Sequence, residues 1–117
     1  MIDHALRYGG AVTLTIAEGA ALSDVLDFRF YAQGVVHMPD AWTAASIGFK
    51  VSPTPTGTFL PLYDAAGTLV EVTPAVDKAY LLPAGVAGAG YVKLWSQTEG
   101  SDVVQVAAAS LALFVKS

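Results

Sequence analysis

Hydrophobic residues recur at every second position in short segments along this chain. Successive side chains of a β-strand point to opposite faces of its sheet, so this spacing is typical of a strand that buries one face. The clearest segments are residues 12–16, 26–30, 47–51, 70–72, 92–94 and 111–115. Weaker ones are residues 35–38, 58–63, 79–82 and 103–107. The pattern predicts an all-β protein with about 8–10 short strands.

The residues between these segments favour a single antiparallel β-sandwich, jelly-roll-like in form. Asp64 and Gly67 occupy the positions that a hairpin turn favours. Residues 40–45 are predicted to form one short helical turn, because Asp40 can cap the amide groups that follow it. The alanines of 103–115 also fit a helix, but the valines and the alternation after Ser110 favour strands. The predicted sandwich covers 11–117 and follows an N-terminal arm, 1–10.

The buried phase of the alternation and the large aromatic residues together define one candidate core. One core suits a chain of 117 residues, because single domains most often have roughly 100–150 residues. The predicted core residues are Phe28, Phe30, Trp42, Phe49, Val92 and Leu94.

Charged residues are sparse, at 14% of the chain against about 25% in an ordinary soluble domain. The net charge of −4 argues against nucleic acid or an anionic membrane surface as a partner. The longest nearly apolar stretch, 103–115, is shorter than the roughly 20 residues of a membrane-spanning helix. We therefore expect exposed apolar patches that meet a protein partner or further copies of the chain.

No motif in the sequence indicates an enzyme. His4 and His37 are the only histidines, and their separation matches no common metal-ligand spacing. Cysteines are absent, and no Gly-x-Ser-x-Gly stretch is present to expose a serine nucleophile. The glycines between Gly85 and Gly90 lack the spacing of a phosphate-binding loop. We expect no catalytic residue, no cofactor and no metal site.

One predicted strand carries a candidate interaction face. Tyr91, Lys93 and Trp95 occupy alternate positions, so they share one face of mixed aromatic and polar character. Such a face suits a subunit interface, and its aromatic rings also suit the stacking of a sugar. A core position for Trp95 is a third interpretation.

The N-terminal arm is a second candidate contact region. Its apolar residues Ile2, Leu6 and Tyr8 lie among charges of both signs. This composition fits an arm that contacts a partner, and it fits a free tail equally well.

Five stretches of the chain, in order, match a pattern known from one group of viral proteins. They comprise residues 12–24, 34–52, 57–72, 91–96 and 105–109. The most specific pair of elements within them is Met38-Pro-x-x-Trp-Thr-x-Ala45 and Leu62-Tyr-Asp-x-x-Gly67. Together the stretches resemble small structural proteins of tailed bacteriophages and prophages. The chain departs from that pattern in the loop 52–57 and at 95–97, which bears on partner specificity more than on fold.

The resemblance implies a non-enzymatic virion component, in particular a head decoration (cement) protein or another accessory subunit. It implies the phage major capsid protein or other virion proteins as partners, a homo-oligomer such as a trimer, and a location in the virion after assembly in the bacterial host cytoplasm. A subunit present in many copies on a particle can bury apolar patches that a free monomer would expose. The alternative is a carbohydrate-binding module on a phage head or tail that mediates attachment to a surface or host.

Overall fold

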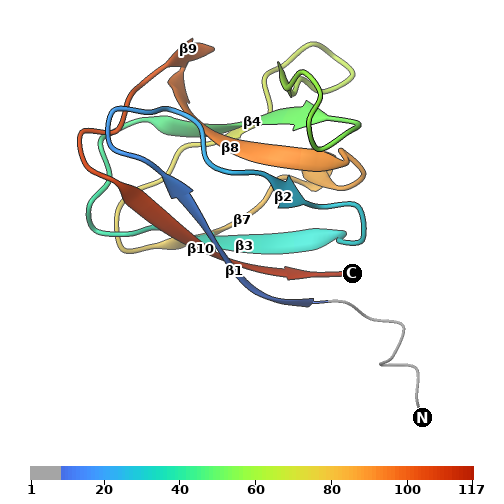
Figure 1. Ribbon diagram of the computed structural model, residues 1–117, viewed down its shortest axis with the longest axis horizontal. Coiled ribbons are helices and arrows are strands. Elements are labelled where there is room, and N and C mark those ends of the chain that lie inside the picture. The colour runs from blue at the N-terminus through green and yellow to red at the C-terminus, as the bar shows by residue number, and fades with distance from the viewer. Residues whose placement is uncertain (1–8) are drawn as a thin grey trace.

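The computed structural model describes residues 9–117, which form two antiparallel β-sheets packed face to face (Figure 1). Sheet A has four strands, in the spatial order β1 (Gly9–Ile16), β10 (Ala109–Lys116), β3 (Gln33–His37) and β7 (Ala79–Leu81). Sheet B has six strands, four of them in the spatial order β2 (Leu26–Asp27), β8 (Tyr91–Thr98), β4 (Ser46–Ser52) and β5 (Leu60–Pro61). Two short strands extend it, β6 (Glu71–Val72) beside β4 and β9 (Ser101–Asp102) beside β8. The predicted antiparallel β-sandwich is confirmed.

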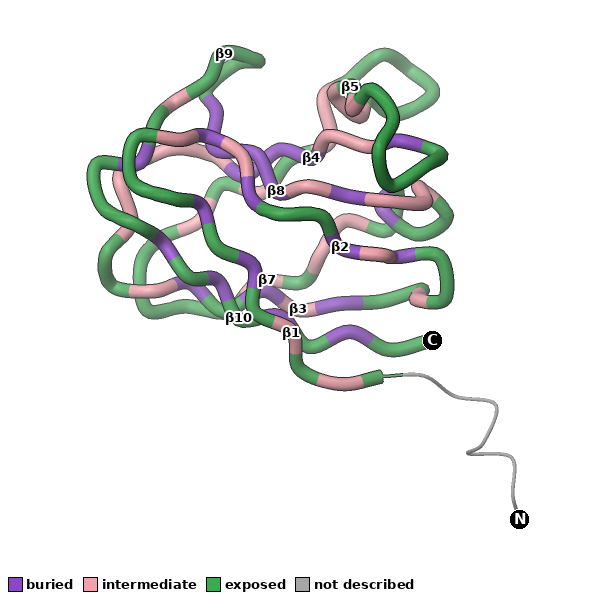
Figure 2. The backbone as a smooth tube through the Cα atoms, in the orientation of Figure 1, coloured by how far each residue is buried: buried purple, intermediate pink, exposed green. Residues whose placement is uncertain are grey.

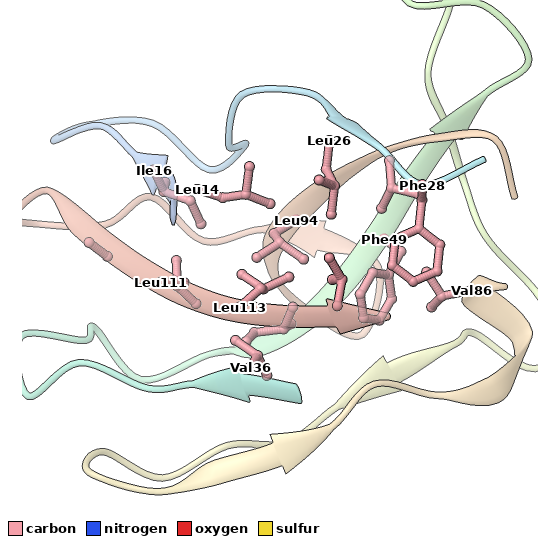
Figure 3. Packing of buried hydrophobic residues seen from close by; sticks show 14 of the residues in the cluster. Leu14, Ile16, Leu26, Phe28, Val36, Phe49, Val86, Leu94, Leu111 and Leu113 are labelled. Carbon is pink, nitrogen blue, oxygen red and sulfur yellow. The ribbon is translucent and has the colours of Figure 1, made fainter. Parts of the chain in front are cut away.

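The alternation along the strands places one side of each sheet in a common core (Figures 2 and 3). Sheet A contributes Leu14, Leu111 and Leu113, and sheet B contributes Phe49 and Leu94. Burying a side chain of this size contributes about 1.5–3 kcal/mol. Among the predicted core residues, Trp42 packs against this cluster while partly buried, and those that are fully buried are Phe28, Phe49, Val92 and Leu94.

Phe30 is the predicted core residue that the structure places outside, with 59% of its surface exposed. The alternation in 26–30 predicts a strand that continues to Phe30, but β2 ends at Asp27. The Asp27 carboxylate accepts the backbone N–H of Arg29 at 3.1 Å, and the N–H of Tyr31 donates to the Phe28 carbonyl at 3.3 Å. These two bonds turn the chain, so that Phe30 lies at the tip of the turn.

The helical turn predicted near residues 40–45 is wrong, because this segment is irregular. A side chain distant in sequence satisfies its backbone instead: Gln105 Oε1 accepts the N–H of Thr43 at 2.8 Å, and Gln105 Nε2 donates to the Thr43 carbonyl at 3.1 Å. The indole N–H of Trp42 donates to the Ala45 carbonyl at 3.2 Å. The one 3-10 helix among the described residues is Ala84–Val86, in a loop whose Val86 reaches the core.

The last part of the chain is a strand, as predicted, but the strand is shorter than the apolar run. β10 covers Ala109–Lys116, whereas the weak strand prediction for 103–107 is wrong. That stretch is irregular because Gln105 turns inward to meet Thr43. At the other end, β1 begins at Gly9, before the expected start of the sandwich at Ala11.

Candidate interaction surfaces

Described residues of this chain enclose no pocket. From Gly9 onward, no three His, Asp or Glu side chains gather as ligands for a metal ion. The same part of the chain has no helix of the length and hydrophobicity that a membrane crossing requires. The distinctive features of the molecule lie on the outer faces of its two sheets.

The predicted face of Tyr91, Lys93 and Trp95 is the outer face of sheet B. The phase is as expected, since Val92 and Leu94 point to the core and the other three residues point away from it. The expectation that Trp95 is an interface residue is wrong, because only 2% of its surface is exposed.

The position of Trp95 follows from its neighbours. Gly48 is its cross-strand partner on β4, and a Cβ atom at Gly48 would lie 2.8 Å from Cε3 of the indole. The missing side chain therefore lets the ring lie against the sheet. The indole N–H donates to Asp102 Oδ1 at 2.7 Å, and the ammonium of Lys50 lies 4.6 Å from the ring centroid. Both the N–H and one face of the indole therefore have partners within the chain.

Three cationic side chains lie over aromatic rings on this side of the molecule. Lys50 covers Trp95, Lys93 lies 4.7 Å from the Phe59 ring centroid, and Arg29 lies 5.0 Å from that of Tyr91. Lys50 and Lys93 are direct cross-strand partners, an arrangement of like charges that is usually unfavourable. The aromatic contacts attract each ammonium toward a ring and offset part of this repulsion.

Arg29 is also half of the ion pair between Asp27 and Arg29, the one ion pair within residues 9–117. Its guanidinium donates through Nε at 2.9 Å to Asp27 Oδ1 and through its terminal nitrogen at 2.8 Å to Oδ2. This fork lowers the pKa of the Asp27 carboxyl from its ordinary value. Both side chains are about half exposed, at 50% and 43%, so solvent screens the interaction strongly.

A buried glutamine completes the outer face of sheet B. Gln97 follows Trp95 in the same phase, and its Nε2 donates to Glu71 Oε1 at 2.7 Å. Its Oε1 accepts the N–H of Gly100 at 2.8 Å, which fixes the turn between β8 and β9. The sequence offered one signal for this role, the position of Gln97 in phase with Trp95. The polar groups here are paired with one another.

The outer face of sheet A has a different character, which the alternation in the sequence does not predict. A cross-strand row runs over all four strands of the sheet through Ala11, Phe114, Val35 and Leu81. Phe114 is 49% exposed and Leu81 is 79% exposed. We call these four residues the apolar row. The sequence feature that points to this row is Phe114, a large apolar residue in the polar phase of its strand.

The rest of this outer face is nearly free of charge. The next row along the strands is Thr13, Ala112, His37 and Ala79, all of them exposed. Lys116, beside Gly9 at one end of the sheet, is the one Lys, Arg, Asp or Glu among the outward positions of the four strands. Removing such a face from water costs little, because few charges lose their hydration and the apolar side chains gain by burial. It is therefore suited to a dry protein contact.

The remaining candidate contact residues lie outside the part of the chain that the structure describes. These are Ile2, Leu6 and Tyr8 of the predicted arm.

Comparison with known proteins finds a similar fold but no matching family. No protein-family model matches this sequence, and no curated protein matches it. Among solved structures, the SPBc2 prophage-derived protein YomS has a similar fold, with a TM-score of 0.56 at 15% sequence identity. The similarity covers 94% of this chain and 96% of that chain. At this identity the likeness shows a shared sandwich fold over nearly the whole of both chains.

Proposed function

We propose that this chain is a non-enzymatic structural subunit of a phage particle. Its resemblance to phage structural proteins supports this role, as does the prophage origin of a solved protein with the same fold. The observation that carries the proposal is the outer face of sheet A, where exposed Phe114 and Leu81 stand in one row with almost no charge around them. A face of this kind gains free energy when another protein covers it.

More specifically, we propose that the chain is a head decoration protein or another accessory subunit located in the virion. The outer face of sheet A packs against the major capsid protein or a neighbouring virion protein, and assembly takes place in the host cytoplasm. Adding many copies buries the same face at every site and stabilises the lattice between subunits. This role requires no chemistry of the chain.

The position of Trp95 argues against the alternative role, which is attachment to a glycan through this residue. Stacking of a sugar needs an exposed aromatic ring, and this indole is buried, bonded to Asp102 and covered by Lys50. Tyr91 is partly exposed, but Arg29 lies over its ring.

The proposed role is tested by removing the two exposed apolar side chains of the row. The double variant Phe114→Ser/Leu81→Ser should lower the number of copies on purified phage particles at least about tenfold, since each lost apolar contact contributes on the order of 1 kcal/mol or more. Both side chains point away from the core, so folding should be retained. Quantitative mass spectrometry of the particles gives the copy number.

A matched control keeps the chemistry of the substitution and changes its place. Leu60→Ser/Val106→Ser removes two exposed apolar side chains that lie outside sheet A, and this variant should load onto particles at the unmodified level. Full occupancy of the Phe114→Ser/Leu81→Ser variant, or equal loss in the control, would refute docking through the outer face of sheet A. Absence of the unmodified chain from purified particles would refute the role itself.

A further inference from the structure

The free edges of the two sheets differ greatly in length. Sheet B ends in β2 and β5, which pair over two residues each, and one edge of sheet A is the three-residue strand β7. The other edge of sheet A is β1, with eight residues, of which the last, Ile16, forms a bridge with Ser23. A free strand edge presents a row of unpaired N–H and C=O groups to other chains, so a long edge is a potential pairing site.

The hydrogen bonds of Thr15 show which backbone groups of β1 face outward. Its N–H donates to Asp24 Oδ1 at 3.0 Å and so points away from β10. Its hydroxyl lies 3.3 Å from that of Ser110, as in the close pairs of an antiparallel ladder that share no main-chain bond. Because this pattern alternates, the N–H and C=O groups of Gly9, Ala11 and Thr13 also face the edge. None of the described residues bonds to the main chain there.

Of the two edge strands of sheet A, β7 is protected by the residues around it. β7 is flanked by Pro74 and Pro83, and Asp77 and Lys78 directly precede it. Such residues discourage edge pairing. Residues 9–17, by contrast, include no charged residue and no proline. The segment 22–24 covers the end of this edge at Thr15 and Ile16. The part from Gly9 to Thr13 has no charge and no proline, and an edge of this kind pairs readily with another strand.

We propose that β1 pairs with β1 of a second copy of this chain, antiparallel, about a two-fold axis at Ala11. In this register Ala11 faces Ala11 of the second copy, and Gly9 faces Thr13 of the second copy. Each such pair exchanges two main-chain hydrogen bonds, so every outward group of Gly9, Ala11 and Thr13 gains a partner. Because both copies use the same strand, the contact is closed and gives a dimer rather than a fibre.

Two observations select this register over its neighbour. Centring the axis on Thr13 would place Ala11 opposite Thr15, whose N–H is already bonded to Asp24. Centring it on Ala11 uses the free groups alone. It also joins the two apolar rows end to end, because Ala11 is the last residue of the row at this edge. The dimer then carries one continuous apolar row on one side of an eight-stranded sheet.

This inference goes beyond the proposed function and does not depend on it. It concerns the edge of sheet A and a second copy, whereas the proposed function concerns the outer face of that sheet and a particle protein. The mass of the purified chain tests the first, and particle occupancy tests the second. The failure of one is therefore distinguishable from the failure of the other.

The first experiment measures the mass of the full-length chain by sedimentation. We expect a dimer, and we expect Ala11→Lys to raise its dissociation constant at least about tenfold by placing two ammonium groups opposite each other at the axis. The matched control is Ala112→Lys, which adds the same charge to an exposed position of the same face on the inner strand β10. The control should remain dimeric. A monomeric unmodified chain, or equal loss of the dimer in both variants, would overturn the proposal.

The second experiment tests the register. The chain has no cysteine, so one introduced thiol reports one position. On mild oxidation Ala11→Cys should give a covalent dimer, because directly opposed residues lie within the Cα separation that a disulfide spans. Thr13→Cys should remain uncrosslinked, because the register separates the two Thr13 residues by several positions along the strand. Crosslinking of Thr13→Cys with none at Ala11→Cys would refute this register.

Discussion

Gln105 joins the distant 40–45 segment to its own segment and to β8. Its side chain is fully buried, bonds the N–H and the carbonyl of Thr43, and donates to the hydroxyl of Ser96 on β8 at 2.9 Å. We expect Gln105→Ala to lower the free energy of unfolding by about 2–4 kcal/mol, because it leaves buried polar groups without partners and opens a cavity. Chemical denaturation measures this loss.

The adjacent residue provides a control for this prediction. Val106 is exposed, and its backbone N–H, which donates to the Thr43 hydroxyl at 3.0 Å, does not depend on its side chain. Val106→Ala should change stability by no more than about 0.5 kcal/mol. An unchanged denaturation midpoint for Gln105→Ala would show that Gln105 does not hold the 40–45 segment in place.

At the scale of single residues, the alternation in the sequence predicts which side of a strand a residue faces, but not what covers that side. Trp95 has the predicted outward phase, yet Gly48 leaves room for its ring and Asp102 binds its N–H. The alternation places Phe30 in the inward phase, but the strand ends before it, at a turn that the Asp27 side chain stabilises. Both outcomes depend on contacts between residues that no local pattern describes.

Among the elements, the hairpin between Tyr63 and Leu69 is the most local and was predicted from its turn residues. Asp64 Oδ1 accepts the N–H groups of Ala66 and Thr68, both at 2.9 Å, and Gly67 adopts a φ of 85°. We expect Asp64→Ala to destabilise the protein by about 1–2 kcal/mol, because both N–H groups lose their acceptor. Asp64→Asn retains an oxygen in that place and should recover most of the loss. Equal denaturation midpoints for Asp64→Ala and the unmodified chain would contradict this account.

Long strands with strict alternation were also predictable, whereas irregular segments were not. β1, β4, β8 and β10 lie where period two is clear, because each buries one face against the opposite sheet. The segment 40–45 was predicted as a helical turn from Asp40, and 103–107 as a strand from its valines. Gln105 determines both, through bonds across 62 residues of sequence. A contact of that range leaves no periodic trace in either segment.

On the scale of the whole molecule, charge is distributed unevenly between the two outer faces. The outward positions of sheet A include one ionised residue, Lys116, while Lys50, Lys93 and Arg29 lie on the side of sheet B. The sequence predicted sparse charge and a need for a partner, but charge counts alone could not say which face would be neutral. That required the strand order, which brings Phe114 beside Val35 and Leu81.

This distribution leads to a prediction about salt. If copies join through β1, the paired strands themselves form no ion pair, because residues 9–17 carry no charge. The dimer dissociation constant should therefore change by less than about threefold between about 0.05 and about 0.5 M NaCl. Sodium sulfate should strengthen the dimer, because sulfate is excluded from protein surface and association removes the surface of the two β1 edges from solvent. Association through the lysines of sheet B would behave in the opposite way, since screening weakens contacts between charged groups. Sedimentation at low and high salt separates the two cases, and a dimer that dissociates as NaCl rises would contradict a contact through β1.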